Sequence, residues 1–366
     1  MASVAIDARM VNSSGIGVYI KNLIPYLQQH FKLYLIGNST ELANYVKEGD
    51  TVIVPVVASI YTLTEQLELF KKIPRCDIFW SPHYNVPALP IASKKRVVTI
   101  HDTYHLAYKD SLSLPQKIFA NFFMKAATKL SDKIITVSEF SKQEIIKYTG
   151  CSASKINTIH NGVDQKHFRE IEATSFPQNL VILPEKYILY VGNVKPHKNL
   201  LTLLKAFSKF TEDDHHNYKL LIVGKKEGFI TSDTQIAKLL QSNRNLENQV
   251  VFTGFVDDKD LPFIYNAASL FVFPSLYEGF GLPPLEAMAC GCPVVATSAA
   301  SIPEVCGNAA AYFYPTDSDT LALLIKKLLN DKIASNKLIE LGRQQVSNFT
   351  WSSASKKHIK LFESLL

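Results

Sequence analysis

The sequence has no long apolar run and few cysteines, and each of these shortages excludes a class of protein. No apolar stretch approaches the roughly 20 residues that a membrane-spanning helix needs. Met1-Ala-Ser is followed at once by the strand-like run VAID, so we expect no signal peptide. Of the five cysteines, Cys290 and Cys292 are two positions apart without a second pair, a spacing that does not suit a zinc site. The odd count favours a reducing cytoplasm.

Composition and net charge limit the number of domains and the kind of partner. The chain has 366 residues, 47% of them hydrophobic, which is enough for two domains with cores of their own. A net charge of +6 is too small to indicate nucleic-acid binding, but it suits an anionic substrate or an anionic membrane face. In the segment 114–130, Lys117, Lys125 and Lys129 are spaced to share one broad helix face. We expect a cytoplasmic protein with peripheral contact to the inner face of the cell membrane; a solvated helix face is the alternative.

The most informative stretch is 270–297, which reads LFVFPSLYEGFGLPPLEAMACGCPVVAT and has the pattern of one βαβ unit. An apolar run ending at Pro274 predicts a buried strand, and Val294 begins a second one. Between them, Pro283 and Pro284 suit the first turn of a helix, where a missing N–H costs least. A ligand is therefore expected at the carboxyl end of the first strand, over the helix N-terminus.

Two carboxylates, Glu278 and Glu286, lie eight positions apart in this loop and helix. Glycine leaves backbone N–H groups open to a phosphate, so we expect a diphosphate to be held there. The residues that would hold it are Gly279, Phe280, Gly281 and Leu282. Each glutamate can accept hydrogen bonds from sugar hydroxyls. The alternative is that Glu286 only faces the helix dipole and Glu278 is solvated.

The run E-G-F-G-L-P-P-L-E-A-M-A-C-G-C-P-V-V resembles the E-x7-E motif of retaining glycosyltransferases of family four, and the resemblance extends over about residues 4–364. It implies an α/β protein with the GT-B fold, in which two Rossmann-like domains face each other across a cleft. It implies that Glu278 holds the donor sugar and Glu286 the ribose, without a metal or other cofactor. In this family the leaving phosphate is thought to take the proton of the acceptor hydroxyl, so no general base from the protein is required.

The first half opens with a Rossmann-like pattern: a strand at Val4–Asp7, a loop, a helix over about 18–29 and a strand over 32–36. Gly15 and Gly17 begin a G-x-G-x-x-G pattern whose third position is Ile20. We expect a turn that permits close approach, next to the acceptor and the donor phosphate as the resemblance implies. A turn with only a packing role is the alternative.

A strand over 96–100 ends at His101-Asp102, which makes His101 a candidate for work in a polar site. The family carries a histidine in a similar I-H-D run, where it contacts the transferred sugar. A histidine satisfied within the core is the alternative. His105 would complete an H-x-x-x-H pair, but no carboxylate follows it in the pattern of a zinc protease, so we expect no metal.

A second strand–loop–helix pattern begins at Tyr187–Val191. The loop that follows holds the candidate donor-binding residues Gly192, Asn193, Lys195, His197 and Lys198. Cations at this place suit a leaving diphosphate, although a solvated basic loop is the alternative. Lys198 corresponds to a lysine of the family, whereas Asn193 stands where the family usually has an arginine. The second cationic role is therefore open between Lys195 and His197. The resemblance also implies that Val256, after a strand over 250–253, lies against the nucleobase.

We predict an acceptor-binding domain over 1–170, a linker within 165–184, a nucleotide-sugar-binding domain over 185–345 and a helix within 346–366 that crosses back to the first domain. The resemblance implies transfer of a hexose to a saccharide or lipid-linked saccharide acceptor in the synthesis of lipopolysaccharide or another cell-surface polysaccharide. GDP-mannose is the expected donor, because the I-D-A-R opening and the I-H-D run are similar to bacterial mannosyltransferases; UDP-glucose or another UDP-sugar is the alternative. Two other classes are a catalytically inactive nucleotide-binding GT-B module and a dinucleotide-dependent oxidoreductase, against which the missing third glycine argues.

Overall fold

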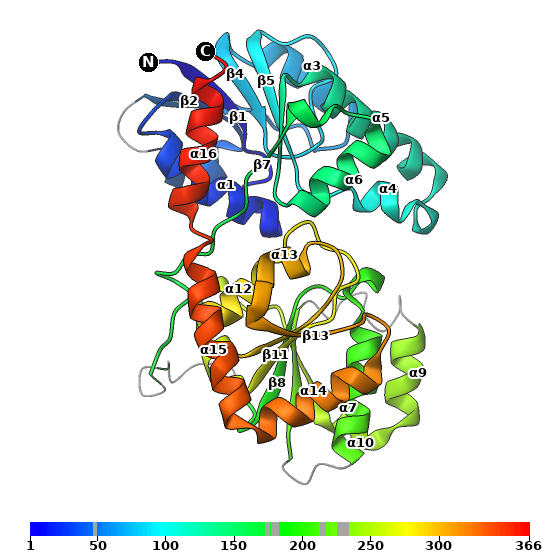
Figure 1. The fold of residues 1–366 in the computed structure, drawn as a ribbon. Helices are drawn as coiled ribbons and strands as arrows, with labels where there is room; N and C mark the ends of the chain where they lie inside the picture. Colours follow the sequence, from blue (N-terminus) through cyan, green and yellow to red (C-terminus); the bar gives the residue numbers. More distant parts are fainter. Residues whose placement is uncertain (47–49, 173–175, 177–182, 213–216, 225–233) are drawn as a thin grey trace. The chain divides into compact units, whose positions relative to one another are not determined.

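The computed structural model describes residues 1–46, 50–172, 176, 183–212, 217–224 and 234–366, which form two compact units (Figure 1). Unit 1 comprises Met1–Gly162 together with Trp351–Leu366, and unit 2 comprises Val163–Thr350. The chain passes from unit 1 to unit 2 at Gly162 rather than at 170, and it returns at Trp351. Much of the segment expected as a linker, 173–175 and 177–182, lies outside the described residues.

Unit 1 is built on a seven-stranded sheet within its described residues, and every strand pair is parallel. The strands lie in the order β3 (Thr51–Pro55), β2 (Lys32–Gly37), β1 (Ser3–Asp7), β4 (Cys76–Ser81), β5 (Ser93–Ile100), β6 (Lys133–Thr136) and β7 (Ile156–Thr158). The order of the strands reverses between β1 and β4, and such a switch point is where open parallel sheets bind ligands.

Alternate residues of the unit 1 strands serve two cores, as the two-residue period of a strand requires. Val4 and Ile6 of β1 pack with helix α1 (Ser14–Leu27) and helix α16 (Trp351–Glu363) on one face of the sheet. Ala5 faces the opposite side, where α3 (Leu63–Lys72) packs, and α5 (Leu114–Leu130) and α6 (Glu139–Thr149) cover the same sheet further along. The short helices of this unit are α2 (Ser39–Leu42) and α4 (Tyr104–Ala107).

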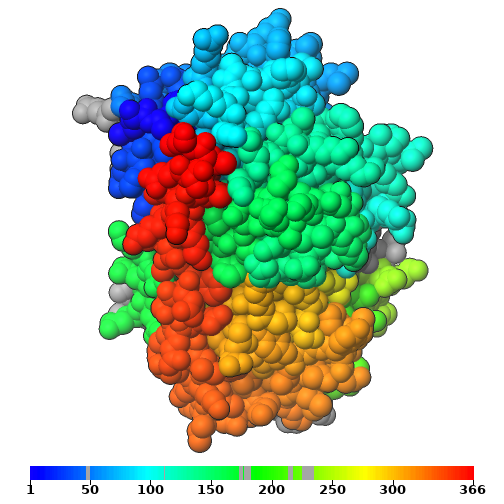
Figure 2. All heavy atoms as spheres, turned by 45° about the horizontal axis from the view of Figure 1, so that its top comes forward, coloured from blue at the N-terminus to red at the C-terminus, as the bar shows by residue number. Residues whose placement is uncertain are grey.

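Helix α16 belongs to the core of unit 1 although it follows unit 2 in the sequence. It packs against α1, and its Trp351, Ala354, Ile359 and Phe362 join the core of β1 and α1. In Figure 1 the red α16 lies next to the blue α1, and Figure 2 shows red atoms against blue ones on the surface. The sheet of unit 1 is therefore covered on one face by residues from both ends of the described sequence.

Unit 2 repeats this architecture with a six-stranded parallel sheet in its described residues. The strand order is β10 (Val250–Gly254), β9 (Lys219–Val223), β8 (Tyr187–Val191), β11 (Leu270–Phe273), β12 (Val294–Thr297) and β13 (Ala310–Phe313). The switch point lies between β8 and β11. The strands β8 and β11 are apolar throughout, which is typical of parallel strands covered on both faces.

The helices of unit 2 cover both faces of its sheet. One face packs against α7 (Leu200–Glu212), α9 (Thr234–Ser242), α10 (Arg244–Gln249) and α14 (Ser318–Asn330). The other helices are α11 (Leu261–Ala267), α12 (Leu282–Ala289), α13 (Ile302–Cys306) and α15 (Lys332–Ser347), of which α12 packs on α15. None of the helices in the described parts of the chain is both long enough and apolar enough to cross a membrane.

The start of α1 differs from the expected position. The helix begins at Ser14 rather than near Val18, so Gly15 and Gly17 lie in its first turns and not in a preceding loop. A Cβ atom on Gly17 would lie 2.4 Å from the carbonyl oxygen of Val11, whereas a Cβ on Gly15 would meet nothing within 4 Å. Of these two positions, only position 17 requires glycine, because the backbone of Val11 lies close to it.

Candidate functional site

The candidate site in unit 2 is formed by the two loops that leave β8 and β11 at the switch point of the sheet. The loop after β8 contains Gly192 and ends in a short 3-10 helix, Pro196–Lys198. The loop after β11 runs from Pro274 to Gly281 and leads into α12. Leu276 N donates to His197 O at 2.7 Å, and Asn199 Nδ2 donates to Pro274 O at 2.9 Å. These bonds join the two loops directly.

Lys198 and Glu278 meet at this point. Lys198 Nζ donates to Glu278 Oε1 at 2.6 Å, and the two side chains are 21% and 14% exposed. A charge-assisted bond of this length between two mostly covered groups fixes both side chains. The loop backbone is fixed as well, because the Ser301 hydroxyl lies 2.9 Å from both Glu278 O and Phe280 O and can donate to either. The structure thus holds one cation and one carboxylate at the carboxyl end of two neighbouring strands.

The loop turns into α12 through Gly281. Its φ of 99° lies in the left-handed region, which favours glycine, and a Cβ there would contact the ring of Phe273 at 3.4 Å. Prolines in the first turn of α12 follow directly, as expected from the sequence. The backbone therefore presents a helix N-terminus beside Glu278, which is an arrangement suited to an anion.

Glu286 lies on α12 and is held by Tyr265 of α11, whose hydroxyl donates to Glu286 Oε2 at 3.0 Å. Burial raises the pKa of Glu286 to about 7, and the hydrogen bond from Tyr265 lowers the pKa and so opposes that rise. A carboxylate with a pKa near neutrality and a fixed orientation can accept hydrogen bonds from neighbouring hydroxyls in its ionised form. Tyr265 was not identified from the sequence.

The other candidate donor-binding residues of unit 2 differ in exposure. Asn193 and Lys195 are exposed, His197 and Leu282 are half-buried, and Gly279 and Val256 are buried. Phe280 is buried with its ring edge-on to Phe349, at a centroid distance of 5.6 Å. Phe280 could therefore meet a ligand only through its backbone.

In unit 1, His101 lies at the carboxyl end of β5 as expected. Its Nε2 lies 2.9 Å from Pro82 O, and because a carbonyl can only accept, Nε2 carries the proton. Burial lowers the pKa of His101, so the ring is neutral and Nδ1 is left as an acceptor. The backbone carbonyl of His101 accepts from Ser141 Oγ at 2.9 Å. Ser138 caps α6 by accepting from Ser141 N at 3.0 Å.

A buried chain of polar groups supports the His101 ring from behind. Tyr19 of α1 packs edge-on to this ring at a centroid distance of 4.9 Å. The Tyr19 hydroxyl lies 2.6 Å from Nε2 of His358 on α16 and 3.1 Å from Thr99 Oγ1. His358 Nδ1 is bonded to Ala354 O, so Nε2 accepts from Tyr19. Helix α16 thus helps to fix the position of His101.

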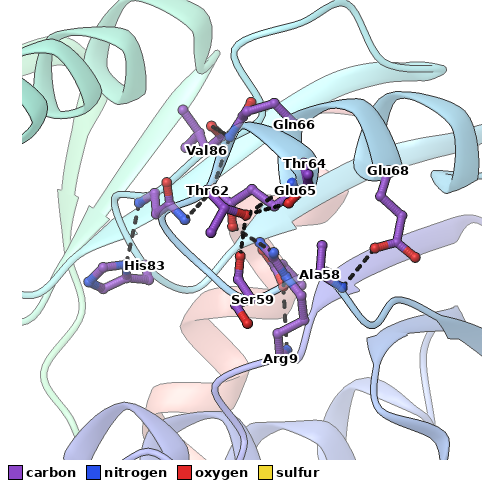
Figure 3. Close-up of polar contacts among 12 residues, drawn as sticks. Arg9, Ala58, Ser59, Thr62, Thr64, Glu65, Gln66, Glu68, His83 and Val86 are labelled. Carbon is purple, nitrogen blue, oxygen red and sulfur yellow. Dashed lines mark hydrogen bonds and ion pairs between the residues drawn. The ribbon is translucent and has the colours of Figure 1, made fainter.

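The switch point of unit 1 holds a buried ionic cluster that the sequence did not predict. The guanidinium of Arg9 donates to Asp7 Oδ2 at 2.6 Å. It also donates to Glu65 Oε2 at 2.8 Å, and Figure 3 shows Arg9 and Glu65 side by side. Asn85 Nδ2 donates to the second oxygen of Glu65 at 2.8 Å. Although burial lowers the pKa of Arg9, the charges of Asp7 and Glu65 raise it above its ordinary value. Only the sequence run I-D-A-R, directly after the first strand, could have suggested the Asp7–Arg9 pair.

This cluster does not form a ligand pocket. The cavity beside Arg9, which Asp7, Pro82 and His83 also line, has a volume of about 10 Å³ and is large enough for about one water molecule. The bonds of the cluster join the end of β1 to Glu65 of α3 and, through Asn85, to the loop that follows β4. Among the described residues, no three His, Cys, Asp or Glu side chains lie together as metal ligands would.

Comparison with known proteins adds the following findings. Residues 13–167 match the family described as Glycosyltransferase Family 4, and residues 172–345 match the family described as Glycosyl transferases group 1. The chain is 30% identical over 279 residues to O-antigen chain mannosyltransferase B of Escherichia coli, a match that covers 76% of this chain and 72% of that protein. It is 32% identical over 278 residues to the serotype-specific mannosyltransferase WbdA of Escherichia coli, covering 74% of this chain and 34% of WbdA. The chain thus spans about a third of the length of WbdA.

Among the solved structures that resemble the whole chain are the following two. Sucrose-phosphate synthase from Thermosynechococcus elongatus has a TM-score of 0.78 at 20% identity, with 100% of this chain and 99% of that chain covered. Anabaena Alr3699/HepE in complex with UDP and glucose has a TM-score of 0.78 at 18% identity, with both chains covered completely. At these identities the likeness shows the fold alone, and it confirms the expected pair of Rossmann-like domains of the GT-B type.

Proposed function

The chain belongs to glycosyltransferase family 4, and from this membership we propose that it is a retaining glycosyltransferase that transfers a hexose from a nucleotide-diphosphate sugar. Mannose is the hexose that the relatives favour, since the two Escherichia coli proteins described above are mannosyltransferases. The acceptor is a saccharide or lipid-linked saccharide, and the product is part of a cell-surface polysaccharide. The name of O-antigen chain mannosyltransferase B supports this assignment.

The observation that carries the proposal is the Lys198–Glu278 pair at the switch point between β8 and β11. A leaving nucleoside diphosphate needs positive charge where its own negative charge develops, and Lys198 with the amides at the start of α12 supplies it. Glu278 then accepts hydrogen bonds from hydroxyls of the transferred sugar. Either Lys195 or His197 adds a second cation.

In the proposed reaction the oxygen of the acceptor hydroxyl forms a bond to the anomeric carbon while the bond from that carbon to the diphosphate breaks. The proton of the acceptor hydroxyl passes to an oxygen of the leaving diphosphate on the same face of the sugar. The anomeric configuration is retained, and no protein residue acts as general base. Glu286 holds the ribose, with Tyr265 keeping its carboxylate in one orientation.

His101 contributes an acceptor rather than a charge. With Nε2 bonded to Pro82 O, the neutral ring offers Nδ1 to a hydroxyl of the transferred sugar. An imidazolium there would lose this acceptor.

Gly15 and Gly17 lie in the first turns of α1 in the same unit, and Gly15 is the exposed one of the two.

The test is a donor panel assayed with the full chain: GDP-mannose, UDP-glucose and further UDP-sugars, with NAD as a negative control in binding. We expect isothermal titration to show that GDP binds more tightly than UDP. We also expect the chain to turn over GDP-mannose. Proton NMR of the product gives its anomeric configuration. An inverted product would contradict the retaining mechanism, and no binding of GDP or UDP at millimolar concentration would contradict the donor site.

A further inference from the structure

Helix α5 of unit 1 exposes a face that is apolar at one end and basic at the other. Its buried side faces the core through Ala120, Phe123, Met124, Ala127 and Thr128. On the opposite side Leu114, Ile118 and Phe122 are 69%, 62% and 57% exposed. At 3.6 residues per turn these three side chains project within an arc of about 80°, and Lys125 and Lys129 fall within the same arc. The exposed apolar residues are therefore one stripe and not scattered positions.

The charge of α5 has one sign. The helix contains Lys117, Lys125 and Lys129 and no Asp or Glu. Lys125 and Lys129 are exposed, and neither forms an ion pair within the described chain. Lys117 lies 4.0 Å from the carboxylate of Asp110, which is itself 93% exposed. The face thus offers uncompensated positive charge beside its apolar stripe.

Helix α3 carries a similar stripe. Leu63, Leu67 and Phe70 are 87%, 55% and 50% exposed, and they project within an arc of about 60°. Its last residues are Lys71 and Lys72. The two helices approach each other at one end, because Tyr61, which precedes α3, packs edge-on against Phe119 of α5 at a centroid distance of 5.5 Å.

We call these two stripes with the lysines of α5 the α3–α5 face. Single exposed apolar residues are common on protein surfaces, but here six large apolar side chains are grouped in two stripes. Grouped apolar side chains of this kind mark sites that bind a partner. Residues 114–130, turquoise to green, lie at the surface of unit 1 in Figure 2.

We propose that the α3–α5 face binds the surface of an anionic lipid bilayer. Helices that lie in a membrane interface combine Leu and Phe on the inserted side with Lys toward the headgroups. On α5 the apolar residues would enter the headgroup boundary and Lys125 and Lys129 would meet anionic headgroups. A second copy of this chain fits less well, because packing this face on itself would bring lysines of like charge together. This binding does not depend on which sugar unit 2 transfers.

The test is co-sedimentation of the full chain with vesicles of phosphatidylglycerol mixed into phosphatidylcholine, and with vesicles of phosphatidylcholine alone. We expect strong binding to the anionic vesicles and weak binding to the neutral ones. The double variant Lys125→Gln/Lys129→Gln should bind the anionic vesicles about 25-fold more weakly, at roughly fivefold for each lysine. The matched control is Lys356→Gln/Lys357→Gln, which removes the same charge from exposed positions of α16 and should change binding less than about twofold.

A second variant, Ile118→Ser/Phe122→Ser, tests the apolar part. At high salt, the natural chain should keep part of its binding to the vesicles, and this variant should lose it. The circular dichroism and the donor binding of the variant should stay unchanged. Equal binding of the natural chain to both kinds of vesicle, or equal losses in the α5 and α16 variants, would overturn the proposal. It would also be overturned if the chain without lipid were a dimer that Ile118→Ser/Phe122→Ser makes monomeric, since the face would then be an interface between copies.

Discussion

Lys198 Nζ and Glu278 Oε1 are 2.6 Å apart although the two residues are 80 positions apart in the sequence. They stand in loops that leave adjacent parallel strands, so the sheet itself brings them together. Glu278 is also fixed from behind through its backbone by Ser301, while Glu286 is fixed through its side chain by Tyr265. The two glutamates of the motif are therefore held in different ways, and different substitutions should separate their roles.

Glu278→Gln and Glu286→Gln should affect different kinetic constants. If Glu278 holds the reacting sugar, its loss should lower kcat by about 10²-fold or more, because charge and ring shape change there in the transition state. If Glu286 holds the ribose, its loss should raise KM more than it lowers kcat. Steady-state kinetics with varied donor measure both. A normal kcat in Glu278→Gln together with a low kcat in Glu286→Gln would require the roles to be exchanged.

The stability of unit 2 should fall as the pH rises through the range in which Glu286 ionises. Burial raises the pKa of Glu286 from 4.5 to about 7, so the folded protein keeps a proton that the unfolded chain has released. The free energy of unfolding then falls between about pH 4.5 and pH 7, by about 3 kcal/mol at most for this group. Glu286→Gln has no carboxyl group at this position, so its free energy of unfolding does not fall for this reason. The stability of the variant relative to the natural chain should therefore rise with pH. Urea unfolding at several pH values measures the difference.

Tyr265→Phe provides the complementary variant. The hydrogen bond from Tyr265 lowers the pKa of Glu286, so its removal should raise that pKa further and extend the fall in stability to higher pH. The same variant should raise KM for the donor without a comparable loss of kcat. Identical pH profiles in Tyr265→Phe and the natural chain would show that the hydroxyl has no such effect.

Gly17→Ala and Gly15→Ala form a matched pair that tests the first turns of α1. A Cβ at position 17 would lie 2.4 Å from Val11 O, so the backbone must move, and we expect a loss of about 1–3 kcal/mol in the free energy of unfolding. A Cβ at position 15 meets nothing within 4 Å, and alanine suits a helix better than glycine by roughly 0.5–1 kcal/mol. Thermal unfolding should therefore shift in opposite directions. Equal shifts would contradict the close approach.

Activity should persist in EDTA and should not increase on addition of manganese, because Lys198 and backbone amides can neutralise the diphosphate. The sequence contains two D-x-D triplets, at 258–260 and 317–319, of the kind that can bind a metal. In the second triplet, Asp317 caps α14 and Asp319 pairs with Lys209. Turnover that vanishes in EDTA and returns with manganese would show that a metal takes part.

Local sequence predicted some helices and strands with the bounds that the structure has. Strands 187–191 and 270–273 and helix 114–130 have the expected bounds, because an apolar run or a helical period is closed by a turn residue or proline. Helix α15 was missed, since only Gly342 and Val346 of its 16 residues are buried and its apolar stripe is faint. Strand β3 was missed for a similar reason, because none of its residues is fully buried.

The candidate site was predicted only where its residues share one motif. Glu278, Glu286 and Gly281 lie within nine positions, whereas Tyr265 reaches Glu286 from a separate helix. Arg9 and Glu65 are 56 positions apart, and His358 reaches Tyr19 over 339 positions. No local pattern encodes such pairs, because the order of strands and the packing of helices bring them together.

The position of α16 has a consequence for the order in which the protein is made. Unit 1 cannot complete its core until Trp351, Ala354, Ile359 and Phe362 have been synthesised, about 190 residues after Gly162. At a translation rate of roughly 5–20 residues per second, the face of the first sheet that α16 covers stays open for about 10–40 seconds. All residues of unit 2 have by then been synthesised. Unit 1 therefore starts first and is completed last, because all residues of unit 2 are synthesised before the residues of α16 that complete the core of unit 1.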